Sequence, residues 1–426
     1  VDEKKKLRMR AVRWFVGSQP MSPTARVVLR LAVLAVDCFL TSWIVHHVAY
    51  TEIDWKAYMQ EVAGFMRGNH DYTFLRGDTG PLVYPAGFVY LFSLLSWVTD
   101  WGENIHTAQL IFAVFYLLLV LLVQHVYVKA SYCNSRDGSP NFAVASPLVL
   151  MTLSASRRIH SIFVLRLFND GVAMILLFAA LLLVIRRRFT LGSILFSLAV
   201  SVKMNILLFA PGYLVVLLVC TGWWTALLQV GLCGVVQLVL ALPFLLVNPW
   251  AYVSRSFDLG RKFFFIWTVN WKWLPEHVFL SNAFAAFLLL IHLSCLVWLA
   301  SRWTKSHGWG CLSASSSRRP KYLSAYDITW LFFVCNFVGI VCARSLHFQF
   351  YVWYYHSLPF LLYHISKRGV PGSWTLILGA IEIVWNIFPA RPVTSFLLCL
   401  VHCFLLYQLL FVAPVGTATD PVPKPK

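Results

Sequence analysis

The stretch DGVAMILLFAALLLVIRRRFTLGSILFSLAVSVK, residues 170–203, decides the fold of this protein. It contains two apolar runs, 171–185 and 190–203, which are separated by three consecutive arginines. A membrane-spanning helix needs roughly 20 apolar residues, and shorter or broken helices are tolerated where they line a cavity. Short loops rich in Lys and Arg face the cytosol. The stretch therefore predicts two membrane helices whose other ends, at Asp170 and Lys203, lie on the non-cytosolic side.

The whole chain has the composition of a membrane protein. Of its 426 residues, 59% are hydrophobic and only 12% are charged, whereas a soluble domain carries about 25% charged residues. We expect an all-α polytopic membrane protein with about twelve transmembrane helices, which form a single membrane-embedded domain. The candidate spans are 27–47, 107–128, 143–156, 171–185, 190–203, 205–220, 226–247, 277–300, 325–343, 351–366, 373–389 and 394–412.

The net charge of +18 would also fit a nucleic-acid-binding protein. The basic residues, however, cluster in short loops between apolar runs, where they act as orientation signals. No basic strand with interleaved aromatic residues and no helix-turn-helix pattern occurs, so we expect no nucleic-acid partner. The ten cysteines lie mostly within apolar runs and form no CxxC pair, so the sequence predicts neither a disulfide framework nor a cysteine metal site.

The basic clusters orient the chain in the membrane. They place the two tails, 1–26 and 413–426, in the cytosol, and the first apolar run then serves as an uncleaved anchor. Four segments and Lys203 fall on the opposite face: 48–106, 157–170, 248–276 and 344–350. This count requires that the apolar segment 86–98, which is too short for a straight span, forms an interfacial or re-entrant helix.

The large loop 48–106 concentrates seven of the 17 acidic residues. Asp54 follows the first span and is accompanied by Trp55 and Tyr58. An aspartate surrounded by aromatic residues at a membrane boundary is partly desolvated, which raises its pKa and makes it a better base. Aromatic rings beside a carboxylate also suit sugars, whose apolar faces stack on rings. Asp54 is therefore a candidate base with Trp55 and Tyr58 as substrate contacts, and the alternative is a solvated loop acid.

Two other acids could supply a second carboxylate. Asp78 lies in the turn GDTGPLVYPAGF (77–88), where its side chain could equally cap the turn. Asp170 follows Asn169 at the start of an apolar run, where the alternative is a helix N-cap. A helix N-cap would explain one of the two neighbouring polar residues, Asn169 and Asp170, but not both. A second acid that faces Asp54 across a cavity is the sharper hypothesis.

Cationic side chains on the same face are candidates for binding phosphate. Lys203 stands between two apolar runs, which predicts either a functional point charge or a lysine that snorkels to the surface. Arg344, His347 and Gln349 begin a span among aromatic residues. Arg344 and His347 could bind a phosphate leaving group, and Gln349 is a candidate for binding the acceptor or the donor, although an interfacial histidine can also be structural.

The segment SRSFDLGRKFFFIWTVNWKW (254–273) mixes basic and aromatic residues. Arg255 and Arg261 are candidates for binding a lipid-linked phosphate or an oligosaccharide, whereas Trp271 fits an aromatic belt at the membrane surface. Two further acids, Asp37 and Glu382, lie within apolar runs. We expect each of them to pair with a polar neighbour inside the bundle.

Six of these stretches occur together in one known family. They are TEIDWKAYM, GDTGPLVYPAGF, RIHSIFVLRLFNDG, SLAVSVKMN, SRSFDLGRKF followed by WTVNWKWLP, and LHFQFYVWY, in this order along the chain. With them the chain resembles the dolichyl-phosphate-mannose-dependent α-1,3-mannosyltransferases of the endoplasmic reticulum, which belong to the GT-C superfamily. Enzymes of this family add the sixth mannose to the lipid-linked N-glycan precursor.

The resemblance implies a site and a mechanism. The first luminal loop of the family carries an aspartate that is proposed as the catalytic base, here Asp54. The second luminal loop carries another acidic or polar group, here Asn169 and Asp170. A single inverting displacement would move mannose from dolichyl phosphate mannose to a dolichyl-diphosphate-linked oligosaccharide, among membrane lipids and without a metal or other cofactor. Four cations would stabilise the departing phosphate: Lys203, Arg344, His347 and Arg166.

Other functions stay open at this point. A polytopic lipid or solute transporter would also carry charges at membrane depth, although the sequence contains no inverted repeat. A related mannosyl- or glucosyltransferase of the same pathway would share the architecture and differ in its loop motifs. The linkage and the acceptor rest on the resemblance alone. The sequence indicates no oligomeric state.

Overall fold

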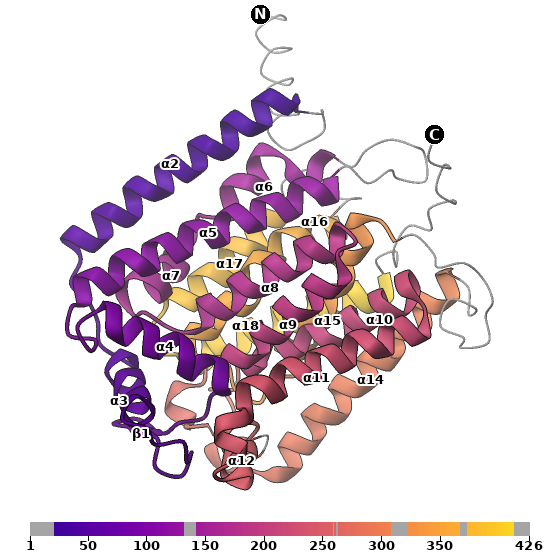
Figure 1. Ribbon diagram of the computed structural model, residues 1–426. Coiled ribbons are helices and arrows are strands. Elements are labelled where there is room, and N and C mark those ends of the chain that lie inside the picture. The colour runs from indigo at the N-terminus through magenta and orange to yellow at the C-terminus, as the bar shows by residue number, and fades with distance from the viewer. Residues whose placement is uncertain are drawn as a thin grey trace, which may run out of the picture.

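Helices account for almost all regular structure in the computed structural model (Figure 1), which describes residues 21–131, 142–258, 260, 263–307, 323–366 and 373–412. The helices are α2 (Pro23–His47), α3 (Trp55–Met66), α4 (Ala86–Val98), α5 (Ile105–Ser131), α6 (Pro147–Thr152), α7 (Arg157–His160), α8 (Asp170–Ile185), α9 (Phe189–Val202), α10 (Ala210–Thr221), α11 (Trp223–Leu245), α12 (Pro249–Ser256), α13 (Glu276–Phe279), α14 (Asn282–His307), α15 (Ala325–Val341), α16 (Leu358–Ser366), α17 (Trp374–Asn386) and α18 (Pro392–Tyr407). Within the described ranges two short strands, β1 (Arg76–Gly77) and β2 (Gly80–Pro81), form one antiparallel hairpin. The expected all-α fold is confirmed. The predicted tails lie outside the described residues, except for 21–26.

Six helices in the described part of the chain are long and apolar enough to cross a membrane. They cover Pro23–His47, Ile105–Ser131, Met204–Thr221, Trp223–Leu245, Asn282–Lys305 and Pro392–Val412. The pair Arg157–Leu165 and Asp170–Ile185 would make a seventh span, although it bends by 111° at the break. Of the four shorter apolar helices, α9, α15 and α17 occupy positions of further predicted spans, and α4 is the segment 86–98 that was predicted not to cross the membrane. The expected number of twelve is therefore not confirmed.

Two predicted spans are not continuous helices. In place of 143–156 the chain forms the six-residue α6, because Ser146 caps α6 and Ser156 caps the next helix, α7. In place of 351–366 it forms 3-10 turns up to Ser357 and then the nine-residue α16. Such short pieces satisfy fewer of their own backbone groups and are stable at membrane depth only where neighbouring protein surrounds them.

Helices α8 and α9 form the antiparallel pair that the sequence predicts. The chain reverses at the three arginines, where Arg187 has a φ of 62°. Helix α5 packs against α8, and α11 and α4 pack against α9 (Figure 1). Because α8 begins at Asp170 and α9 ends at Val202, the side chains of Asp170 and Lys203 lie at the same end of the pair.

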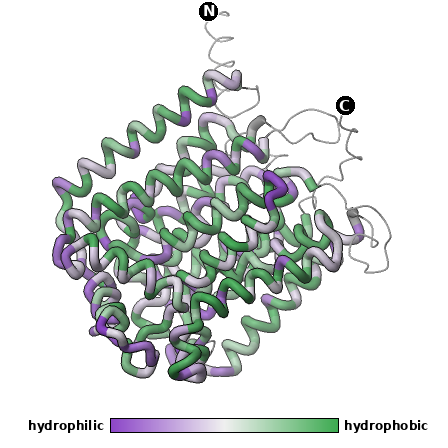
Figure 2. The backbone as a smooth tube through the Cα atoms, in the orientation of Figure 1, coloured by the Kyte–Doolittle hydropathy of each residue, from purple (hydrophilic) through white to green (hydrophobic). Residues whose placement is uncertain are grey.

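The loop 48–106 folds into an ordered cap that contains α3, the β1–β2 hairpin and α4 (Figure 1). Hydrophilic residues gather around α3 and β1, in contrast to the hydrophobic helices of the bundle (Figure 2). Asn248, the N-cap of α12, donates to both carboxylate oxygens of Asp71 at 3.2 and 3.1 Å and so ties the cap to α12. As expected, 86–98 forms one helix of 13 residues, too short for a straight span.

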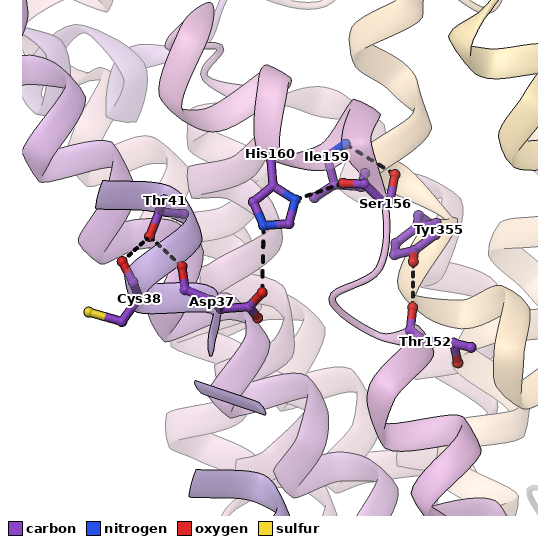
Figure 3. A network of polar contacts seen from close by, with 8 residues as sticks. All are labelled: Asp37, Cys38, Thr41, Thr152, Ser156, Ile159, His160 and Tyr355. Atoms are coloured by element: carbon purple, nitrogen blue, oxygen red, sulfur yellow. Dashed lines mark hydrogen bonds and ion pairs between the residues drawn. The ribbon is translucent and has the colours of Figure 1, made fainter. Parts of the chain in front are cut away.

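The two acids within apolar helices are paired, as predicted. Asp37 Oδ1 of α2 lies 3.5 Å from His160 Nε2, and His160 Nδ1 lies 2.8 Å from the Ser156 carbonyl oxygen (Figure 3). Ser156 Oγ donates to Glu382 Oε1 of α17 at 2.9 Å, and Asn386 Nδ2 donates to the same oxygen at 2.7 Å. These contacts connect α2, α7 and α17 at a depth where an unpaired charge would be costly.

Gly87 lets α4 approach α9 closely, beside the end of α9 that leads to Lys203. A Cβ at Gly87 would lie 2.0 Å from Ser201 Oγ and 3.0 Å from the Ser201 carbonyl carbon. We expect Gly87→Ala to lower the free energy of unfolding by about 1–3 kcal/mol, because Ser201 must shift. Thermal unfolding of the purified protein measures this loss. Gly231→Ala is the control, because a Cβ there meets nothing within 4 Å; equal losses in both variants would contradict the close approach.

Candidate active site

Asp54 directly precedes α3 and lies beyond the end of the first long helix. Its side chain makes no capping hydrogen bond, although the residue occupies the N-cap position. Instead Oδ2 accepts from the hydroxyl of Tyr58, one helical turn further on, at 3.3 Å. The half-buried carboxylate is therefore not used to stabilise the helix, which leaves it available for chemistry.

Tyr58 connects Asp54 to the start of α8. Its buried hydroxyl also lies 3.4 Å from Asn169 Oδ1, so that a single proton faces two acceptors from distant parts of the chain. Asn169 Oδ1 accepts a second hydrogen bond, from Lys203 Nζ at 2.8 Å. The result is a continuous polar path from Asp54 to Lys203.

Asp170 and Lys203 form a buried ion pair, with 2.7 Å between Oδ1 and Nζ. The position of Asp170 in the first turn of α8 also favours a carboxylate, because the helix dipole is positive at that end. Lys203 is only 8% exposed, so the snorkelling alternative does not hold. Asn169 occupies the N-cap position of α8, but it makes no side-chain capping bond and directs its oxygen to Lys203 instead.

Two buried polar atoms at this ion pair have no hydrogen-bond partner among the described residues, namely Asn169 Nδ2 and Asp170 Oδ2. The first atom is a donor and the second is an acceptor. Buried polar groups are almost always satisfied, and an exception needs an explanation. A ligand that carries several hydroxyl groups, such as a sugar, would satisfy both atoms.

Aromatic rings from two segments surround the ammonium group of Lys203. The centroids of Tyr84, Phe350 and Trp353 lie 5.3, 5.5 and 6.0 Å from Nζ. Trp353 also donates its indole N–H to Asp170 Oδ1 at 2.5 Å. The faces of these rings attract a cation, and together they exclude water from the ion pair.

The electrostatic surroundings of Asp54 suit a base. Burial raises the pKa of the Asp54 carboxyl above its usual value, the cation of Lys203 opposes this shift, and the negative charge of Asp170 adds to it. Asp78, by contrast, has a lowered pKa because it accepts a hydrogen bond from Lys56 on the exposed surface. Two acids of the same loop thus have pKa values shifted in opposite directions, because Asp54 is desolvated and Asp78 accepts a hydrogen bond on the surface.

Arg344 and His347 lie on the segment between α15 and α16, and a second segment clamps this one in place. Asn270 donates to the Ala343 carbonyl oxygen at 3.0 Å and accepts from the Leu346 backbone N–H at 2.8 Å. Arg344 Nη2 is buried without a hydrogen-bond partner among the described residues. His347 stacks on Phe350, with 5.1 Å between ring centroids and planes only 2° apart. Two cationic candidates, Lys203 and His347, therefore contact the same ring.

Among the described residues, the side chains of the remaining candidates make no hydrogen bond or ion pair with Asp54, Asn169, Asp170 or Lys203. Trp55 is buried and donates its indole N–H to the Gly102 carbonyl oxygen at 2.9 Å, which gives it a structural role in the cap. Asp78 pairs with Lys56 at 2.8 Å on the surface. Arg166 donates to Ser161 Oγ. Arg255 and Gln349 are half-buried on α12 and on the 3-10 segment Phe348–Trp353. Arg261 lies outside the described residues.

Comparison with known protein families identifies the family of this chain. The model of the family described as "ALG3 protein" matches residues 31–395, which include every contact of the site. This chain belongs to the ALG3 family. It is a multi-pass membrane protein of that family, consistent with its long apolar helices. No solved structure matches the chain.

Relatives of this ALG3-family chain come from animals and plants. It is 48% identical to a Homo sapiens protein named "Dol-P-Man:Man(5)GlcNAc(2)-PP-Dol alpha-1,3-mannosyltransferase" over 91% of this chain and 87% of that protein. It is 48% identical to a Mus musculus protein of the same name, over 89% of this chain and 87% of that protein. An Arabidopsis thaliana protein, also of that name, is 42% identical over 91% of this chain and 88% of its own length.

Three residues that hold the site together were missed by sequence reasoning. They are Tyr84, Trp353 and Asn270. All three lie in stretches that were singled out for other residues or for their overall pattern. Aromatic residues are so frequent here, at 16% of the chain, that position alone does not separate a site residue from a core residue. Among the described residues, no three His, Cys, Asp or Glu side chains gather closely enough to hold a metal ion.

Proposed function

We propose that this ALG3-family chain transfers mannose from dolichyl phosphate mannose to Man5GlcNAc2-PP-dolichol in α-1,3 linkage, at the luminal face of the endoplasmic reticulum. The curated relatives carry this activity in their names and are up to 48% identical over most of the chain. The observation that carries the proposal for this chain is the polar path from Asp54 through Tyr58 and Asn169 to the buried Lys203–Asp170 pair.

Asp54 acts as the general base in this proposal. It takes the proton from the 3-hydroxyl of the acceptor mannose while that oxygen attacks C1 of the donor mannose. The bond between C1 and the phosphate oxygen breaks, and dolichyl phosphate leaves with the electron pair. Because attack and departure occur on opposite faces of C1, a β-linked donor gives an α-linked product in one step. The raised pKa of Asp54 makes it a stronger base than an ordinary aspartate.

Lys203 binds the departing phosphate, with Arg344, His347 and Arg166 as candidates for further contacts. A positive charge held in a desolvated site stabilises developing negative charge far better than the same charge in water. Asp170 holds Lys203 in place through the ion pair rather than acting as a second base. The buried atoms Asn169 Nδ2 and Asp170 Oδ2 receive hydroxyl groups of the transferred or accepting mannose.

The reaction proceeds without a metal ion in this proposal, because Asp54 activates the acceptor and the cations neutralise the phosphate. Transfer of labelled mannose from dolichyl phosphate mannose to Man5GlcNAc2-PP-dolichol by the purified protein, with a chelator present, tests both statements. We expect full activity in chelator. No transfer by folded protein would overturn the assignment of substrates, and transfer that is lost in chelator and restored by a divalent cation would overturn the metal-free mechanism.

The acid limb of the pH–rate profile should report Asp54. Only the carboxylate takes a proton, so kcat/KM falls as the pH drops through the raised pKa of Asp54. Asp170→Asn should move this limb to lower pH, because the charge of Asp170 raises that pKa, and Lys203→Gln should move it to higher pH, because the cation lowers it. Profiles of kcat/KM for the three proteins check this, and shifts in the same direction would contradict the assignment.

A further inference from the structure

The segment Phe348–Trp353 forms a 3-10 helix that begins directly after His347. A 3-10 helix has three residues per turn, so side chains three positions apart lie one above another. His347, Phe350 and Trp353 have this spacing and form a continuous stack of rings. Phe350 and Trp353 are 3.8 Å apart with planes at 18°, and His347 and Phe350 are 5.1 Å apart with planes at 2°. The local helix type thus aligns three rings in one column.

The lower end of this column reaches the ion pair. Trp353 donates its indole N–H to Asp170 Oδ1 at 2.5 Å, and the same oxygen contacts Lys203 Nζ at 2.7 Å. The rings of Trp353 and Phe350 also face Nζ at 6.0 and 5.5 Å. The upper end of the column is His347. Its ring packs nearly perpendicular to that of Phe263, with 5.2 Å between the ring centroids and 81° between the planes. One 3-10 segment therefore contacts Lys203 at one end of the column and carries His347 at the other.

We propose that Trp353 is a positioning residue for the donor phosphate: its N–H holds the Asp170 carboxylate, and Asp170 in turn holds Lys203 toward the phosphate of the polyprenyl donor. The stack with Phe350 sets the distance between Lys203 and His347, so that both groups reach one phosphate. This inference rests on the proposed function. It gives a role to a residue that contacts neither the donor mannose nor the acceptor mannose. It predicts that the loss of one N–H group weakens phosphate binding without altering the acceptor site.

Trp385 provides a matched control. It is fully buried, more deeply than Trp353, donates its indole N–H to Tyr354 Oη at 2.7 Å and stacks on Tyr351 with 4.8 Å between ring centroids. Trp353→Phe and Trp385→Phe each remove one indole N–H and keep an aromatic ring. Only the first substitution removes a hydrogen bond to Asp170. A general loss of core packing would affect both variants alike.

The experiment measures the affinity of the full-length purified protein for dolichyl phosphate, which carries the lipid and the phosphate but no sugar. We expect Trp353→Phe to weaken binding about tenfold or more, since a hydrogen bond to a charged group is lost, and Trp385→Phe to change it less than about twofold. In the Asp170→Asn background the further effect of Trp353→Phe should shrink below about twofold, because the charged acceptor is gone. In turnover assays, KM for the oligosaccharide acceptor should stay unchanged in Trp353→Phe.

Phe350→Leu is a second variant, in case Trp353→Phe does not fold. It keeps the indole N–H but removes the stack, and we expect it to weaken dolichyl phosphate binding about threefold, in line with the energy of one aromatic pair. Equal effects of Trp353→Phe and Trp385→Phe, an undiminished effect in the Asp170→Asn background, or no binding of dolichyl phosphate by the wild type would each overturn the inference. Binding that follows the expected pattern without mannose transfer would sustain it and overturn the proposed function instead.

Discussion

Asp54→Asn should lower kcat for mannose transfer by about a thousandfold, within the range for loss of a general base. The substitution keeps the shape of the side chain, so the hydrogen bond from Tyr58 has an acceptor and the fold is preserved. KM for both substrates should change little, because the proton is transferred only in the transition state. Steady-state kinetics with dolichyl phosphate mannose and Man5GlcNAc2-PP-dolichol measure the effect.

Asp78→Asn is the matched control for this prediction. Asp78 belongs to the same loop but is more than half exposed and pairs with Lys56 on the surface. We expect activity within about threefold of the wild type, because an exposed ion pair contributes little. If Asp54→Asn kept activity within about tenfold of the wild type, a magnitude below that of general-base catalysis, Asp54 could not be the base. Asp170, which faces the same polar path, would then be the next acid to test.

Lys203→Met should have the second large effect, on both stability and activity. It leaves the fully buried carboxylate of Asp170 without its cation, and breaking a buried pair from one side costs about 3–5 kcal/mol. The loss of a cation that stabilises the departing phosphate should lower kcat by about a hundredfold or more. Thermal unfolding and transfer kinetics measure the two effects on the same preparation.

The double variant Lys203→Met/Asp170→Asn separates these two effects. We expect it to recover most of the thermal stability, because no unpaired charge stays buried, while its activity stays low. Lys56→Met is the surface control: the Lys56–Asp78 contact has nearly the same length, 2.8 Å against 2.7 Å, but both side chains are more than half exposed. The loss of thermal stability in Lys56→Met should be barely measurable. Recovery of activity in the double variant would contradict a role for Lys203 at the phosphate.

Much of the site could be predicted from local sequence, because ionisable residues in apolar surroundings are rare and need a reason. Asp54, Asp170 and Lys203 stood out on this basis, and the structure brings their side chains together through Tyr58 and Asn169. Asp78, a candidate from a turn of the same loop as Asp54, has a carboxylate that instead faces Lys56 on the surface. Distinguishing it from Asp54 requires the direction of each side chain, which depends on how the whole cap packs.

The sequence by itself determined the helical membrane class, the pairing of α8 with α9 and the position of Asp170 and Lys203 at the same end of that pair. These properties follow from hydrophobicity and charge along short stretches. Only the tertiary structure decided which polar groups meet, that the segments around 143–156 and 351–366 are short and broken, and that Trp353 reaches Asp170. The physical reason is that hydrogen bonds and ion pairs between residues 34 or 183 positions apart depend on how helices pack, and no local pattern encodes that packing.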